Sequence, residues 1–121
     1  MPIARSRVSA DHSVSLGAKL FRGLGDPTRL AILRMIAEAG EMRVTDLVGR
    51  IGGSQANVSG HVACLKDCGL VVDRPQGRQV FYSLSDPRVV EVLRAGEDLL
   101  ALFGERVELC PNYVERDGGD R

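Results

Sequence analysis

The stretch SQANVSGHVACLKDCGLVVDRPQGRQVFYSL, residues 54–84, decides the fold because a helical pattern changes there into a strand pattern. Ser54 suits the N-cap of a helix. Val58, Val62 and Leu65 then recur at the i, i+4, i+7 spacing of one helix face. The first half of the stretch is therefore predicted to be a helix whose apolar stripe faces the core.

A β-hairpin is predicted directly after this helix. The helix is expected to end at Cys68, because Gly69 stands where a C′ glycine is common. Leu70–Val72 is predicted as a strand, Pro75–Gly77 as a turn, and Gln79–Leu84 as a second strand with β-branched and aromatic residues.

Two helices are predicted upstream. Asp26 and Pro27 combine an N-cap with proline at the first helical position, and the apolar pattern continues to Gly40. A short helix follows over Val44–Arg50 and ends at Gly52. Two short helices joined by a glycine-containing turn and followed by a hairpin are typical of a winged helix-turn-helix. We expect a mainly α fold with a β-hairpin wing.

The two ends of the chain extend this architecture. Apolar residues over Ser15–Leu24 predict a first helix, and Asp86 starts a last helix that reaches Phe103. The apolar faces of residues 16–24 and 89–103 exceed what a monomer of this size needs, which favours a homodimer. The predicted organisation is a flexible N-terminal arm (1–13), a DNA-binding and dimerisation domain (14–104) and an acidic tail (105–121).

The bulk composition fits a small globular protein. A chain of 121 residues with 44% hydrophobic and 26% charged residues fits one soluble domain. No stretch reaches the roughly 18 apolar residues of a membrane span, and the N-terminus lacks the apolar run of a secretory signal. The expected compartment is the reducing cytoplasm, where three cysteines are free thiols or metal ligands.

The distribution of charge permits nucleic-acid binding although the formal net charge is zero. Residues 1–80 carry eleven Lys and Arg against seven Asp and Glu, whereas residues 81–121 carry five against nine. A basic body with an acidic tail can still present a face that attracts phosphates, because local potential steers the ligand.

Polar side chains lie opposite the apolar stripe of the helix that begins at Ser54. Amides, hydroxyls and an imidazole there can reach base edges in a major groove or the phosphates beside it. Arginines flank the hairpin turn, where cations meet phosphates or enter a minor groove. An ordinary solvated surface is the alternative interpretation of both sets.

Three segments resemble, in the same order, signatures of the arsenic-repressor (ArsR/SmtB) family: DPTRLAIL (26–33), QANVSGHV (55–62), and LV (70–71) followed by GRQVFY (77–82). Gly60 is a departure, where many relatives carry His, Gln or Asn, and is expected to remove one DNA contact. The resemblance implies a homodimeric repressor whose first and last helices pair across the dimer axis. Each recognition helix would enter one half-site of double-stranded operator DNA, and a metal or another signal would release it.

The predicted DNA contacts are Ser54, Gln55, Asn57, Val58, Ser59, His61, Arg74, Arg78 and Gln79. Val58 belongs to the apolar stripe as well as to this set.

The cysteines suggest a metal site. Cys64 and Cys68 are one turn apart on one helix face, so their sulfurs can converge on one ion, and Cys110 in the tail could supply a third. Three thiolates favour soft ions over Mg²⁺ or Ca²⁺. Buried structural cysteines are the alternative, because a lone C-x₃-C is weak evidence.

The family resemblance supports the metal interpretation. The segment CLKDCGLV, residues 64–71, is similar to that of the cadmium- and lead-sensing CmtR-like members, which take a third Cys from the tail. This similarity implies that Cys64, Cys68 and Cys110 bind Cd(II) or Pb(II) as the inducer, with Zn(II) as a further option and no organic cofactor. Two other metal sites of the family are missing, since residues 41–47 carry no thiol and the last helix no His.

Three other classes of function are possible, of which a metal-blind architectural DNA binder is disfavoured by the cysteine in the tail. An enzyme is not expected, because both thiols lie towards the C-terminal end of their helix, where the macrodipole disfavours a thiolate. The stronger alternative is a thiol-redox or persulfide-sensing repressor of the same fold. A disulfide between residues i and i+4 would, however, strain the helix.

Overall fold

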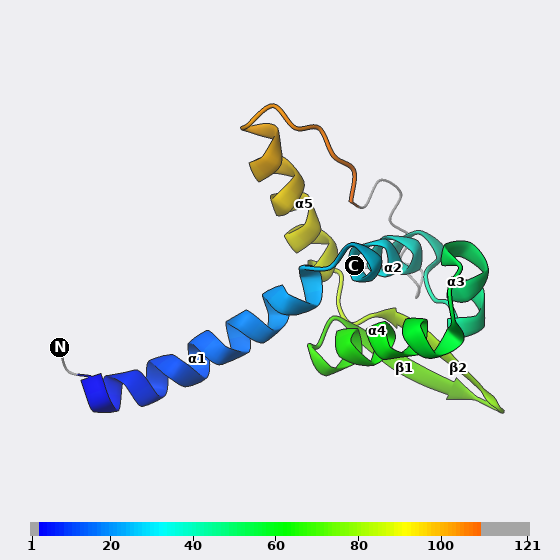
Figure 1. Ribbon diagram of the computed structural model, residues 1–121, viewed down its shortest axis with the longest axis horizontal. Helices are drawn as coiled ribbons and strands as arrows, with labels where there is room; N and C mark the ends of the chain where they lie inside the picture. The colour runs from blue at the N-terminus through cyan, green and yellow to red at the C-terminus, as the bar shows by residue number, and fades with distance from the viewer. Residues whose placement is uncertain (1–2, 110–121) are drawn as a thin grey trace.

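The computed structural model describes residues 3–109, with side chains from Asp11 onwards. It confirms a mainly α fold with a β-hairpin (Figure 1). The elements are α1 (Ile3–Leu24), α2 (Pro27–Ala39), α3 (Val44–Ile51), α4 (Gln55–Asp67), β1 (Val71–Gln76), β2 (Gln79–Leu84) and α5 (Arg88–Ala101).

Local signals fix the ends of α2 and α4 where the sequence predicts them. The Asp26 carboxylate accepts a hydrogen bond from the Arg29 backbone N–H (3.0 Å), and this bond is the main reason why the pKa of Asp26 is lowered. At the other end of α2, Gly40 has φ +90° and donates its N–H to the Ile36 carbonyl. Ser54 caps α4 in the same way, its hydroxyl accepting from the Asn57 N–H (3.0 Å).

The core lies where α2, α3 and α4 pack against one another and against β1. The largest fully buried side chains of this core are Ile32, Leu33, Ile36, Leu47, Val58, Val62, Leu65 and Val71; Val90 of α5 is buried with Leu93 in a second, smaller cluster. Val58 is 0% exposed, so its predicted DNA contact must be corrected. The i, i+4, i+7 stripe directs this side chain into the core, where it fixes the rotation of α4.

The hairpin differs from the predicted one in its turn. The pairing of Gln76 with Gln79 leaves Gly77 and Arg78 as a two-residue turn, and Pro75 pairs with Val80 inside β1. Proline is tolerated there because β1 is an edge strand. The other side of β2 pairs with the loop between α2 and α3, since Met42 and Tyr82 exchange N–H···O bonds of 2.9 and 2.8 Å.

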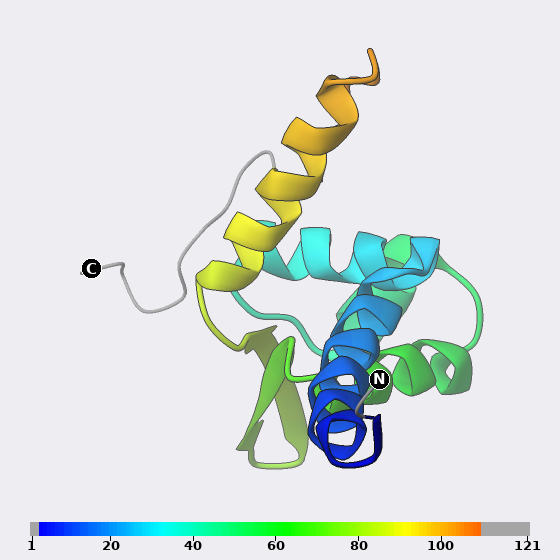
Figure 2. The same ribbon diagram turned by 90° about the vertical axis from the view of Figure 1, so that its left-hand side faces the viewer.

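Helices α1 and α5 project away from the body of the molecule (Figures 1 and 2). Helix α1 begins at Ile3 rather than near Ser15, because no glycine or proline interrupts the chain between Pro2 and Gly17. Large apolar side chains on α1 and just beyond α5 are exposed: Phe21 is 63%, Leu102 78% and Phe103 74% accessible. Within the described residues, no helix is long and apolar enough to cross a membrane.

Candidate nucleic-acid interface and thiol pair

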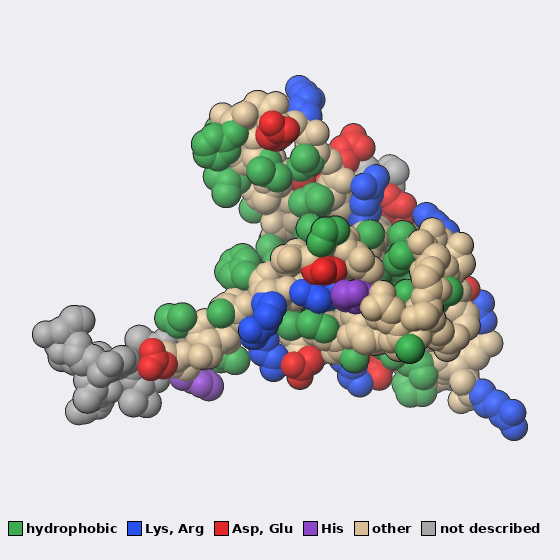
Figure 3. All heavy atoms as spheres, viewed as in Figure 1, with side chains coloured by type: hydrophobic (Ala, Val, Ile, Leu, Met, Phe, Trp, Pro, Cys, Tyr) green, Lys and Arg blue, Asp and Glu red, His purple; other side chains and the backbone are tan. Residues whose placement is uncertain are grey.

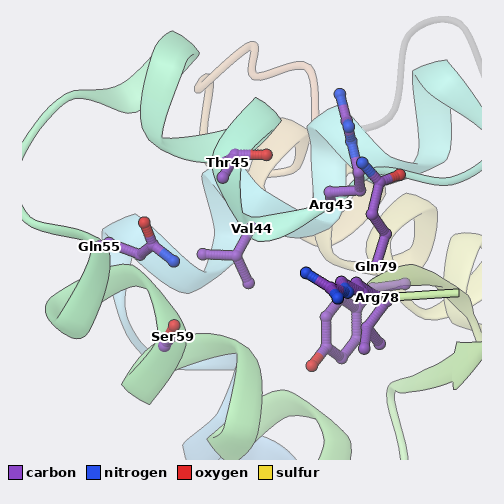
Figure 4. A pocket seen from close by; sticks show the side chains of 9 residues that line it. Arg43, Val44, Thr45, Gln55, Ser59, Arg78 and Gln79 are labelled. Carbon is purple, nitrogen blue, oxygen red and sulfur yellow. The ribbon is translucent and has the colours of Figure 1, made fainter. Parts of the chain in front are cut away.

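The N-terminal turns of α4 present polar side chains to solvent. Gln55 and Asn57 are exposed and Ser59 is half-buried, while Ser54 is exposed and occupied in capping the helix. Gln55 and Ser59 face a depression of about 280 Å³ that continues onto α3 and the wing (Figure 4). Four of the predicted residues, Gln55, Ser59, Arg78 and Gln79, are thus brought around one hollow.

The same depression contains Arg43 and Thr45, which the sequence analysis missed. Both lie at the start of α3, where the Arg43 side chain donates two hydrogen bonds to the Asp46 carboxylate (3.0 and 2.8 Å) and the Arg43 backbone N–H donates a third (3.0 Å). This ion pair lowers the pKa of Asp46. The sequence signal that could have identified them is an arginine and a threonine at the start of the short helix that precedes the predicted recognition helix.

The two wing arginines have different environments. Arg78 is exposed in the hairpin turn, and a basic side chain forms the extreme tip of the wing (Figure 3). Arg74 is held by the Glu41 carboxylate through bonds of 2.6 and 3.3 Å, which raise its pKa, and it lies 4.9 Å from the centre of the Phe81 ring. Arg78 is therefore available to a phosphate, whereas Arg74 supports the base of the wing.

His61 lies away from Gln55 and Ser59. Its Nδ1 is 3.8 Å from the Asp26 carboxylate and 3.4 Å from the Arg29 guanidinium, at the junction of α1 and α2. Three- and four-residue spacing places His61, Cys64 and Cys68 on one face of α4, and this face packs against α1. The predicted DNA contact of His61 does not agree with this partly buried position.

The two thiols of α4 are neighbours and both are partly buried. Cys68 donates a hydrogen bond from Sγ to the Lys19 carbonyl of α1 (3.1 Å). Burial raises the pKa of the Cys68 thiol, and the adjacent Cys64 raises it further. The raised pKa makes the Cys68 thiol a poor nucleophile at neutral pH, and sulfur ligands suit a soft ion.

The third predicted ligand, Cys110, lies outside the described residues. Between residues 3 and 109, no cluster brings together three or more His, Cys, Asp or Glu side chains in metal-binding positions. The described part of the chain thus contains two of the three predicted ligands, Cys64 and Cys68. It ends at Leu109, whose backbone N–H donates to the Glu97 carboxylate (2.5 Å).

Comparisons with known proteins agree with this arrangement. Residues 26–72 match the family described as "Bacterial regulatory protein, arsR family". The chain is 40% identical to a probable mercury resistance operon repressor of Streptomyces lividans, over 77% of this chain and 74% of the relative. It is 42% identical to the HTH-type transcriptional regulator CmtR of Mycobacterium bovis, over 63% of this chain and 64% of CmtR. The solution structure of a homodimeric winged helix-turn-helix DNA-binding domain from M. bovis has the same fold, with a TM-score of 0.70, 23% identity and coverage of 94% of this chain and 100% of that domain.

Proposed function

This chain belongs to the arsR family of bacterial regulatory proteins, and on that premise we propose that it is a dimeric operator-binding repressor released by a soft metal ion. Family membership makes it a DNA-binding transcriptional regulator with a winged helix-turn-helix, not an enzyme. The observation that carries the rest of the proposal is that one helix, α4, bears both the predicted DNA contacts and the thiol pair. Its exposed N-terminal turns carry Gln55 and Asn57, and its last turns carry a thiol pair.

In the proposed complex, α4 enters the major groove. Gln55 would read a base edge, and Asn57 and Ser59 would contact bases or phosphates. The wing would supply Arg78 and Gln79 as contacts to the DNA backbone. Arg43 and Thr45 would approach the backbone from α3, on the other side of the same depression. The N-terminal end of α4 would add to the attraction for phosphate through its helix dipole.

We propose that α1 and α5 form the dimer interface. Their exposed apolar side chains gather over α5 and over the part of α1 that faces it (Figure 3). A symmetric pair would hold two recognition helices about 34–36 Å apart, one turn of DNA, on an inverted repeat. The dimer also explains why a 121-residue chain leaves these side chains uncovered.

For the inducer, we propose one Cd(II) or Pb(II) ion per subunit, with Zn(II) as a weaker option. Cys64 and Cys68 would hold it together with Cys110, and three thiolates would bind a soft ion strongly. Metal binding and DNA binding would then oppose each other through α4, with reciprocal coupling of about 1–3 kcal/mol.

The proposal is tested by titrating the reduced protein with cadmium chloride, with and without a fluorescent operator duplex. Sulfur-to-metal charge-transfer absorption should saturate at one ion per subunit, and the duplex should be released over the same range. Release by peroxide, with a mass shift and no metal uptake, would favour the thiol-redox repressor instead. Absence of both responses would contradict a sensor role for the thiols.

A second prediction concerns the wing. Arg78→Ala should weaken binding to operator and unrelated duplexes alike and reduce the salt dependence by about one phosphate contact, because the exposed guanidinium is lost. Gln55→Ala should instead cost about 1–3 kcal/mol on the operator and relax its sequence preference. Fluorescence anisotropy at several salt concentrations separates the two effects. Two variants that bind like the wild type at matched salt would contradict both assignments.

A further inference from the structure

A notch on α1 receives the side chain of Cys68. It lies at Gly23, where an added Cβ would stand 2.9 Å from Cys68 Sγ and 3.1 Å from Cys68 Cβ. The same Cβ would meet Leu70 Cδ1 at 3.1 Å. Contacts below 3.0 Å are essentially never made by a real Cβ. Only glycine at this position lets the sulfur approach the α1 backbone so closely.

Two more contacts hold the C-terminal end of α4 on this part of α1. Cys68 Sγ donates to the Lys19 carbonyl, one helical turn before Gly23 (3.1 Å). The Lys19 ammonium pairs with the Asp67 carboxylate at 3.1 Å. This ion pair is largely solvent-exposed and therefore weak, so the partly buried sulfur in the notch is the more specific attachment.

The N-terminal half of α4 is connected to the same turn of α1 through Arg29. Its guanidinium donates to the Gly23 carbonyl (2.9 Å) and to the Arg22 carbonyl (2.6 Å), and it lies 3.4 Å from His61. The recognition helix is thus attached to the end of α1 at two points: His61 through Arg29, and Cys68 through the notch.

We propose that the Gly23 notch couples the thiol pair to DNA binding. With the Cys68 sulfur seated in it, α4 is held against α1 in the arrangement that fits the operator. A soft divalent cation that draws this sulfur towards Cys64 empties the notch and releases the C-terminal end of α4, which then pivots about the His61 attachment. This inference rests on the proposed function and identifies Gly23 as a positioning residue for the switch.

The geometry explains why a small movement of one sulfur would reach the DNA. Phe21, exposed on α1 two residues before Gly23, belongs to the proposed dimer interface. Helix α1 runs unbroken through both positions, so a change in how α4 rests on Gly23 changes the angle between α4 and the dimer axis. The spacing of the two recognition helices on DNA depends on that angle.

Gly23→Ala tests the proposal without any metal. Alanine is a better helix former than glycine, so the helix itself is not weakened, but the new methyl group displaces the sulfur. We expect the metal-free variant to bind the operator at least about tenfold more weakly than the wild type, which is within the usual range of allosteric coupling. Cadmium chloride should then cause little further release. Gly17→Ala is the matched control, because it lies on the same helix with nothing within 4 Å of the added Cβ, and should bind like the wild type.

A second variant distinguishes displacement of the sulfur from general damage to the fold. Cys68→Ala in the Gly23→Ala background removes the clashing sulfur and should restore operator binding to the level of Cys68→Ala alone. A double variant that binds the operator more weakly than Cys68→Ala alone would overturn the proposal. So would a Gly23→Ala protein with wild-type operator affinity and wild-type cadmium response. A wild-type protein that ignores cadmium would instead count against the proposed function.

Discussion

Cys64→Ser is expected to weaken cadmium binding by at least about 100-fold and to abolish metal-induced release of the operator, because a hydroxyl replaces a soft thiolate ligand. The metal-free variant should keep wild-type operator affinity. The three atoms nearest to an added Cβ at Gly23 belong to Cys68 and Leu70, not to Cys64. The measurements are charge-transfer absorption during a cadmium titration and anisotropy of a labelled operator duplex.

The other two cysteines provide the comparison. Cys110→Ser should keep DNA binding and lose much of the metal response, since two thiols remain. Cys68→Ser should lose metal binding. It should also change how α4 packs against α1, because it alters the side chain that donates to the Lys19 carbonyl. If all three serine variants retain full cadmium-induced release, the cysteines are structural and the sensor proposal fails.

Phe21→Glu is expected to separate the dimer and to reduce operator affinity by about 100-fold or more, because the second half-site no longer binds as an intramolecular event. The side chain is 63% exposed on α1, so the charge should leave the fold of the monomer intact. At a dimer interface, however, the carboxylate would be desolvated without a partner. Sedimentation velocity at micromolar concentration reports the oligomeric state directly.

Val72→Glu is the charge-matched control for this prediction. Val72 is 44% exposed and belongs to β1, not to α1 or α5, so its substitution should leave the dimer intact. A wild-type protein that sediments as a monomer, or a Phe21→Glu protein that remains a dimer, would rule out the assignment of α1 to the interface.

The sequence predicted those features that depend on local chemistry. Asp26 with Pro27, Gly40, Ser54 and Gly69 mark helix ends through capping and backbone conformation, and each lies where it was expected. The turn was predicted to begin at Pro75, but Pro75 pairs with Val80 inside β1. The sequence of β1 alone does not show that this strand lies at an edge, where proline is tolerated.

The positions of His61 and Arg74 depended on contacts between distant segments. His61 meets Asp26 and Arg29, 35 and 32 residues away in the chain, and Arg74 meets Glu41, 33 residues away. Periodicity along one helix or strand carries no information about such partners. Gly23 escaped notice for the same reason, because its role is set by a sulfur 45 residues further along.

The bridge between Met42 and Tyr82 allows the tip of the wing to evolve independently of the wing's orientation. It is made by backbone groups alone, so the direction of the wing does not depend on which side chains stand at its tip. Arg78 and Gln79, the first residues after Gly77, can therefore be exchanged without turning the hairpin. Operator preference can drift, or be redesigned by grafting a different tip, while the thiol pair and its seat on α1 are inherited unchanged.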